Sequence, residues 1–248
     1  MRLIKAIQAF LFFLSLLAFS PVCRAYDSFH PEAEETLQKG ETWVEVTFKK
    51  HEYKAHTTTR ARYPFPVQEV WRILIDTNTY KDRYSDYSDS RTLDKNQFAL
   101  VVRKKPDSIR GFYELIGGQD FPSEYGRKPG GVWTSYILQR FNLPWPLNDR
   151  WAVSKVKNDE SQGSKGKYRY EYETLVGNFK TLEGYWELLP VPGKPGWTEF
   201  RGEYDSDPGI QYPQFLAKSI FRASMKKSVE ANKKVLEEKS GVAKRNVE

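Results

Sequence analysis

The chain has a single cysteine, Cys23, among its 248 residues. Removal of the N-terminal segment after Ala25, which is predicted below, would leave a mature chain without a disulfide, a thiol nucleophile or a cysteine ligand for a metal. The three histidines, His30, His51 and His56, form no metal-binding spacing such as H-x-x-E-H. We therefore expect neither a metal site nor a cofactor, and a domain that is stabilised by the packing of its core.

Motifs that hold phosphates or activate nucleophiles are also missing. The sequence has no glycine-rich phosphate loop, no nucleophile elbow and no paired-carboxylate signature, and Gly117-Gly118 indicates a turn only. Loss of Arg2, Lys5 and Arg24 with the N-terminal segment lowers the formal charge from +7 to +4. Because so weak an excess of positive charge does not favour nucleic-acid binding, we expect no nucleic-acid partner. We also expect a monomer.

Only one long apolar run is present, at the N-terminus. Two cations precede it, and it extends from Ala6 to Phe19, which is shorter than the ~20 residues of a membrane-spanning helix. Cys23 and Ala25 then supply residues at the −3 and −1 positions of a cleavage site. We predict a secretory signal over residues 1–25 and a periplasmic or secreted location, with an uncleaved membrane anchor as the main alternative. Val22 directly before the cysteine disfavours a lipoprotein signal.

Aromatic residues are abundant, at 15% of the chain. They are suited to half-buried strands and to the wall of a cavity. Period-two alternation predicts strands at residues 43–48, 53–63, 91–94, 97–103, 132–140, 150–158, 167–174, 182–189 and 197–204. A turn rich in proline and glycine, residues 190–196, separates the last two strands.

Apolar residues at three- and four-residue spacing predict helices. A short helix covers residues 31–39, a second covers 66–76, and residues 78–87 form looser helical turns. A long amphipathic helix follows the turn at Asp207-Pro208-Gly209 and carries the apolar residues Phe215, Leu216, Ile220, Phe221, Met225, Val229 and Leu236. Residues 104–131 predict a long loop with one short element at 111–116.

The elements predict one α+β domain. Residues 26–40 form an N-terminal segment with a short helix, residues 41–238 form the domain, and residues 239–248 form a charged tail. An antiparallel sheet packed against one long helix can enclose an apolar cavity, and this cavity is the main indication of function.

Four segments, residues 63–76, 144–153, 184–188 and 209–216, resemble those of the START-like, or SRPBCC, helix-grip superfamily of lipid-transfer domains and polyketide cyclases. The resemblance implies a curved antiparallel sheet wrapped around a long C-terminal helix, with short helices after the first long strand. It further implies an apolar cavity, which in this superfamily often binds a ligand without catalysing a reaction. The sequence departs from the lipid-transfer relatives at Asp149-Arg150, where these usually carry Arg-Asp, and residues 104–131 have no obvious counterpart.

Several side chains are candidates for lining such a cavity. Tyr168, Tyr170 and Tyr172 share one face of a strand, although alternation does not say which face turns inward. The stripe on the long helix needs no ligand to explain it, because packing alone would account for it. The candidates are Tyr136, Leu138, Trp151, Tyr168, Tyr170, Tyr172, Trp186, Phe200, Phe215, Phe221 and Met225.

Asp149 and Arg150 could contact a polar headgroup, with a surface ion pair as the alternative. The basic C-terminal part of the long helix could attract anionic headgroups and allow transient contact with a membrane surface, or could be a solvated helix face. We expect an exported domain that binds, and could transfer, a lipid or another hydrophobic molecule. Two alternatives stay open: a cyclase or dehydratase that uses Asp149, Arg150, Tyr170 and Tyr172, and a ligand-free protein-interaction module.

Overall fold

The computed structural model describes residues 31–48, 52–145 and 149–241. The predicted secretory signal lies outside the described residues, as do positions 242–248 of the charged tail. The chain divides into two compact units, residues 1–35 and 36–248. Helix α2 (Pro31–Gln38) coincides with the helix predicted at residues 31–39 and ends in the second unit. All other elements belong to the second unit.

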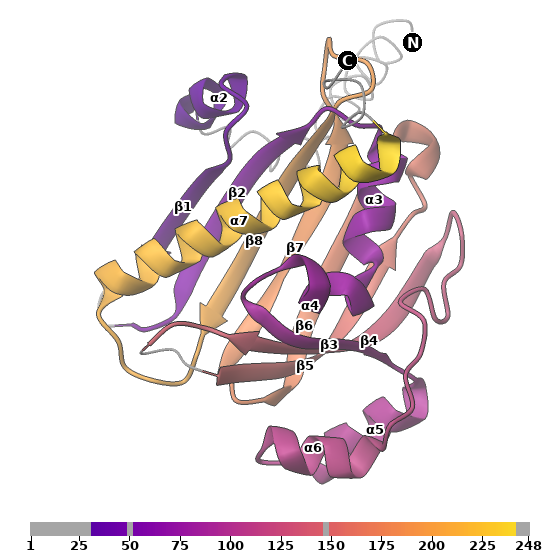
Figure 1. Ribbon diagram of the computed structural model, residues 1–248, viewed down its shortest axis with the longest axis vertical. Coiled ribbons are helices and arrows are strands. Elements are labelled where there is room, and N and C mark those ends of the chain that lie inside the picture. Colours follow the sequence, from indigo (N-terminus) through magenta and orange to yellow (C-terminus); the bar gives the residue numbers. More distant parts are fainter. Residues whose placement is uncertain (1–30, 49–51, 146–148, 242–248) are drawn as a thin grey trace, which may run out of the picture. The chain divides into compact units, whose positions relative to one another are not determined.

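The described residues form an eight-stranded sheet in which all neighbouring strands are antiparallel. The spatial order is β1-β2-β8-β7-β6-β5-β4-β3, so the first two strands join the last strand rather than the third. Figure 1 shows that the sheet is curved. The strands are β1 (Trp43–Phe48), β2 (Ala55–Tyr63), β3 (Tyr87–Leu93), β4 (Val132–Asn142), β5 (Asp149–Asp159), β6 (Tyr168–Gly177), β7 (Thr181–Pro190) and β8 (Thr198–Asp207).

The long helix α7 (Gln214–Ser240) lies across one face of this sheet (Figure 1). Helices α3 (Val67–Ile75) and α4 (Tyr80–Arg83), with the 3-10 turn η1 (Thr77–Thr79) between them, contact α7 on the same face. The main core is packed between these helices and the sheet. This arrangement confirms the helix-grip fold. No helix in the described ranges is both long enough and apolar enough to cross a membrane.

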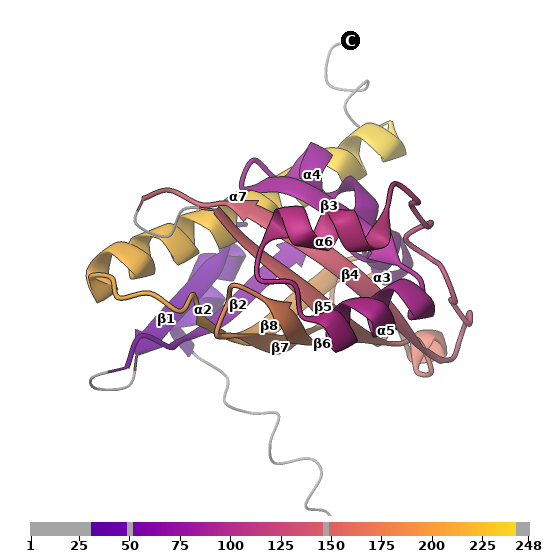
Figure 2. The ribbon, with the colours of Figure 1, turned by 90° about the horizontal axis from the view of Figure 1, so that it is seen from below.

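The opposite face of the sheet is covered by two helices, α5 (Lys95–Lys104) and α6 (Ile109–Ile116) (Figure 2). A second core lies beneath them, with Val101 and Phe112 packed against Leu138, Trp151 and Val153 of the sheet. The strand predicted at residues 97–103 is therefore wrong, and the short element predicted at residues 111–116 within the loop is helix α6. A second 3-10 turn, η2 (Gly163–Lys165), follows β5.

Local capping explains why residues 95–104 are helical in spite of their strand-like apolar run. The Asp94 carboxylate accepts a hydrogen bond from the Gln97 backbone N–H (2.7 Å), and the Gln97 side chain accepts one from the Asp94 N–H (3.3 Å). This capping box satisfies two backbone donors at the start of the helix. The helix ends at Lys105, which has a left-handed backbone conformation (φ 45°).

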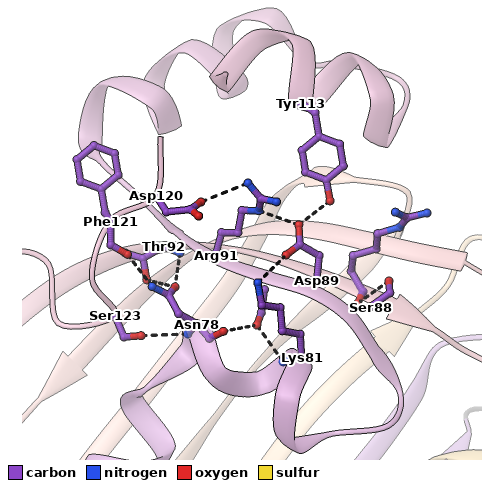
Figure 3. Close-up of polar contacts among 12 residues, drawn as sticks. Asn78, Lys81, Ser88, Asp89, Arg91, Thr92, Tyr113, Asp120, Phe121 and Ser123 are labelled. Carbon is purple, nitrogen blue, oxygen red and sulfur yellow. Dashed lines mark hydrogen bonds and ion pairs between the residues drawn. The ribbon is translucent and has the colours of Figure 1, made fainter. Parts of the chain in front are cut away.

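A carboxylate on the edge strand β3 attaches α6 to the sheet (Figure 3). The Asp89 carboxylate accepts hydrogen bonds from the Tyr113 hydroxyl of α6 (2.6 Å) and from Nε of Arg91 (2.8 Å). Arg91 also pairs with Asp120 (3.2 Å), which lies beyond α6. Because Asp89 is buried, both of its donors stabilise the charged carboxylate in a poorly solvated position.

Asn78 holds the chain that follows α6 against the same edge strand (Figure 3). Its side-chain amide donates to the carbonyl of Phe121 (2.6 Å) and accepts from the backbone N–H of Thr92 (2.7 Å). Its backbone N–H donates to the Ser123 hydroxyl (3.0 Å). Phe121 and Thr92 form an isolated antiparallel bridge, so this segment covers part of the free edge of β3.

A second buried carboxylate, that of Glu160, connects the core to the loop before β4. It accepts hydrogen bonds from Nε1 of Trp71 (2.7 Å), from Nε of Arg127 (3.0 Å) and from the Gly130 N–H (3.1 Å). Burial alone would raise the pKa of the Glu160 carboxyl, but the hydrogen bonds from these donors lower it below the usual value. Trp71 in turn packs edge-on against Trp186 (centroids 5.6 Å apart), which supports the site described next.

Candidate functional site

A cavity of about 190 Å³ lies between the sheet and α7. Side chains of β2, β4, β6, β7 and β8 contribute to its wall, and α7, α3 and α4 close it. The described residues that line it are all uncharged. They are Thr59, Tyr63, Leu74, Tyr80, Tyr84, Tyr87, Gln139, Phe141, Leu143, Tyr170, Tyr172, Phe179, Leu182, Tyr185, Trp186, Phe200, Gly202, Tyr204, Ser206, Phe221, Ser224, Met225, Ser228, Val229 and Asn232.

The sheet side of the cavity is a layer of aromatic rings. Tyr170 of β6 lies directly opposite Trp186 of β7 in the strand register, and their rings stack with centroids 4.4 Å apart and planes 10° apart. Phe200 of β8 lies beside Trp186 (6.0 Å), and Tyr172 lies beside Tyr170 (5.9 Å). Cross-strand pairs of this kind stabilise the sheet, so they give the cavity a preformed wall.

The helix side is one face of α7. Phe221, Ser224, Met225, Ser228 and Val229 follow one another at three- and four-residue spacing, which places them on the same face of the helix. Two of these five residues are serines, which are small. Their side chains leave space unfilled where larger side chains would reach the aromatic wall.

One end of the cavity is polar. There the Asn232 side-chain oxygen accepts hydrogen bonds from the Tyr84 hydroxyl (2.8 Å) and from Nη1 of Arg83 (3.2 Å). Nη2 of Arg83 donates to the carbonyl of Asp76 (2.7 Å), and the guanidinium lies over the rings of Tyr80 and Tyr84. These contacts hold Asn232 in place although it is almost fully buried.

Burial raises the pKa of the tyrosine hydroxyls around the cavity, because a phenolate is poorly solvated there. The pKa of Tyr204 is raised to about 12. Burial shifts the pKa in the same direction for Tyr63, Tyr80, Tyr84, Tyr87, Tyr170 and Tyr172. All these hydroxyls are therefore neutral hydrogen-bonding groups near neutral pH.

Six of the residues predicted to line a cavity do line it in the structure: Tyr170, Tyr172, Trp186, Phe200, Phe221 and Met225. They come from three neighbouring strands and from the helix that faces them. Their contact with a ligand stays a prediction.

Three predicted residues, Tyr136, Leu138 and Trp151, lie instead on the other face of the sheet. They pack in the core beneath α5 and α6, where the ring of Tyr136 stacks on Phe98 (4.0 Å). The error has a clear cause. Alternation identifies residues that share a face but not which face of the sheet that is. Of the two helices on the second face, α5 was predicted as a strand, and α6 only as a short element of unstated type.

Tyr168 and Phe215 are also outside the lining. The Tyr168 ring stacks on Trp71 (5.0 Å) in the main core. Phe215 lies in the first turn of α7 and is 76% exposed, so it points away from the sheet. The spacing of the apolar residues on the helix placed Phe215 in the stripe, but the cavity-lining residues of α7 begin at Phe221.

The two residues of the predicted polar pair, Asp149 and Arg150, do not form an ion pair with each other in the structure. Asp149 pairs with Arg140 of the neighbouring strand (2.7 Å) at a partly exposed position, and Arg150 donates to the Asp149 backbone carbonyl (3.0 Å). Burial lowers the pKa of Arg150. Neither Asp149 nor Arg150 is among the residues that line the cavity, and their contact with a ligand headgroup stays a prediction. The alternative of a surface ion pair fits Asp149, although its partner is Arg140 and not Arg150.

The polar end of the cavity was not predicted from the sequence. Tyr80 and Tyr84 are four residues apart in a segment that was predicted only as loose turns. Asn232 interrupts the apolar stripe of the long helix between Val229 and Leu236, and a polar residue at such a position could have been noticed. Among the described residues, no group of three or more His, Cys, Asp or Glu side chains could hold a metal ion.

A curved sheet that encloses a cavity with one long helix defines a helix-grip domain. The family described as "Polyketide cyclase / dehydrase and lipid transport" matches residues 63–233, which is more than half of the chain. The chain therefore belongs to this family, and the resemblance to the START-like, SRPBCC superfamily is confirmed. The match lies within the predicted domain at residues 41–238. No curated protein is significantly similar in sequence.

Several solved structures are similar to this chain, although they share little sequence with it. The STAR-related lipid transfer protein from Xanthomonas axonopodis (fragment 25–204) is 15% identical, with a TM-score of 0.54 over 79% of this chain and 93% of that one. The Zhui aromatase/cyclase from Streptomyces sp. R1128 is 14% identical (TM-score 0.43; 79% and 96% covered). Human STARD10 is 11% identical (TM-score 0.48; 86% and 82% covered). The likeness to the Xanthomonas protein agrees with the helix-grip fold.

Proposed function

We propose that the protein binds a neutral, hydrophobic small molecule in the cavity under α7 and can transfer it. The observation that carries this proposal is the uncharged, aromatic lining of an internal space. Removing an apolar ligand from water into such a space is favourable by about 25 cal/mol per Å² of apolar surface. The proposal agrees with the lipid transport for which the family is named and with the name of the Xanthomonas structure, a STAR-related lipid transfer protein.

The size of the cavity limits the ligand. Its volume of about 190 Å³ is below the ~300–1,000 Å³ of pockets that enclose drug-sized molecules. A compact ring system or part of one acyl chain fits without rearrangement. A larger lipid requires α7 or the neighbouring loops to move outward, which makes the helix a gate as well as a lid.

The lining favours binding over cyclase chemistry. An acid–base catalyst works best with a pKa near the operating pH. Burial moves the pKa of the lining tyrosines away from neutrality, and the acidic and basic candidates of the cyclase alternative, Asp149 and Arg150, lie outside the cavity. Turnover of a polyketone that is abolished by Tyr170→Phe, with binding retained, would establish the enzyme instead.

Protein purified from its natural host is expected to carry an extractable hydrophobic molecule. Organic extraction followed by mass spectrometry identifies it, and titration of the emptied protein with a fluorescent lipid analogue measures uptake. Trp186 lines the cavity, so its fluorescence is expected to change on filling. An empty extract together with no uptake of the analogue would reject the proposal.

We also propose that the protein is exported to the periplasm or secreted. The support is the pattern of residues 1–25 alone: two cations, an apolar run and a cleavage site after Ala25. The intact mass of the protein from its natural host is expected to correspond to a chain that starts at Tyr26. A mass that includes residues 1–25 would contradict cleavage and leave the membrane anchor as the explanation.

A further inference from the structure

Asn232 lies at the polar end of the cavity, and its side-chain oxygen is engaged in two hydrogen bonds. Its oxygen accepts from both Tyr84 and Arg83. Because a guanidinium can only donate, the amide atom that faces Arg83 must be the oxygen. The two N–H bonds of the same amide take no part in these contacts. Asn232 lines the cavity and is only 3% exposed.

A second donor lies at the same end. Tyr63 of β2 lines the cavity, and its hydroxyl is fully buried near Asn232. A contact with the Asn232 side chain opposes the rise in the pKa of this hydroxyl, but the hydroxyl makes no hydrogen bond of acceptable geometry with any described residue. Buried hydroxyls without a partner are uncommon in folded proteins, because their desolvation is not compensated. A ligand atom that accepts a hydrogen bond would satisfy it.

Given the proposed binding function, on which this inference rests, we propose that Tyr63 and Asn232 together bind a hydrogen-bond-accepting oxygen of the ligand, such as a ketone carbonyl. The ligand enters with this oxygen first, and in the bound state its apolar part packs against Trp186. An acceptor is favoured over a donor because the Asn232 oxygen is already used twice. Arg83, behind the amide, polarises its N–H bonds and strengthens them as donors.

A neutral oxygen is favoured over a carboxylate. The described lining carries no charge, and Arg83 is not part of it. A carboxylate in this space would lose its hydration without gaining an ion pair, which is unfavourable. The ligand class is therefore a hydrophobic ketone, aldehyde or ester rather than a free fatty acid.

Two probes that differ in one group test this inference: tetralin, and 1-tetralone, which carries a carbonyl in place of one methylene. Their dissociation constants are measured by calorimetry on the wild type and on two variants, Tyr63→Phe and Asn232→Leu. The readout is the change of each constant from wild type to variant, so the different hydration of the probes cancels. Tyr63→Phe removes a hydroxyl without a protein partner and is expected to fold normally. Tyr168→Phe, a buried tyrosine outside the lining, is the matched control.

We expect each variant to weaken the binding of 1-tetralone by about ten-fold, because one buried hydrogen bond is lost. The binding of tetralin is expected to weaken by less than two-fold. The control is expected to change neither constant. If Tyr63→Phe leaves 1-tetralone binding unchanged, or weakens both probes equally, the carbonyl site is rejected while the binding function stands. If neither probe binds the wild type, the proposed function and this inference are both overturned.

Discussion

Replacing Ser228 by leucine is expected to weaken tetralin binding by about ten-fold or more without lowering the free energy of unfolding. Ser228 lines the cavity from α7. A leucine there extends into the space that the ligand would occupy. Its burial and its better helix propensity are both favourable, so the free energy of unfolding is expected to stay unchanged or rise by about 1 kcal/mol. Calorimetry and urea denaturation measure the two effects.

The matched control is Ser219→Leu, the same change on an exposed position of the same helix. It is expected to leave tetralin binding unchanged. A Ser228→Leu protein that binds tetralin as tightly as the wild type would place the ligand somewhere else. A large loss of stability in Ser228→Leu would show that the space beside Ser228 is already filled in solution.

Glu160→Ala is expected to lower the free energy of unfolding by about 2–4 kcal/mol. The substitution leaves three donors, those of Trp71, Arg127 and Gly130, without their acceptor in a site where the Glu160 side chain is 4% exposed. Urea denaturation measures the loss. The control is Glu173→Ala, which removes a surface pair with Lys155 (3.5 Å) at an exposed position. Such pairs contribute about 0–1 kcal/mol, so the control is expected to be nearly neutral.

The same carboxylate predicts how stability depends on pH. Its pKa is lower in the folded protein than in the unfolded chain, so its contribution is fully present above the unfolded value of about 4.3. It is lost as pH falls through the lower folded value. Glu160→Gln does not titrate, so the difference in stability between wild type and Glu160→Gln is expected to shrink on acidification. A difference that stays constant from pH 7 to pH 3 would contradict this explanation.

The fold class could be predicted because its signals are local. Eight of the nine strands predicted from alternation are present in the structure, and the apolar spacing from Phe221 to Leu236 predicts the long helix. The predicted strand at residues 97–103 failed because its apolar run suits either structure, and the capping box between Asp94 and Gln97 decides for the helix. That error removed α5, one of the two helices that pack on the second face of the sheet.

The cavity residues were predicted only in part, for a related reason. Leu138 and Trp151 alternate as cavity-lining residues would, but they pack on the second face of the sheet, beneath α5 and α6. The polar end depends on contacts between Arg83, Tyr84 and Asn232, which are distant in sequence. No periodic pattern brings such residues together. Only the position of Asn232 within an apolar stripe gave a local indication.

The most direct test of the hollow interior is a crystal structure of the protein with 1-tetralone bound. We expect electron density for the ring system between Trp186 and α7, with the carbonyl oxygen within hydrogen-bonding distance of Tyr63 and Asn232. Density for the probe only outside the described lining, or a space between sheet and helix closed by side chains, would contradict the account.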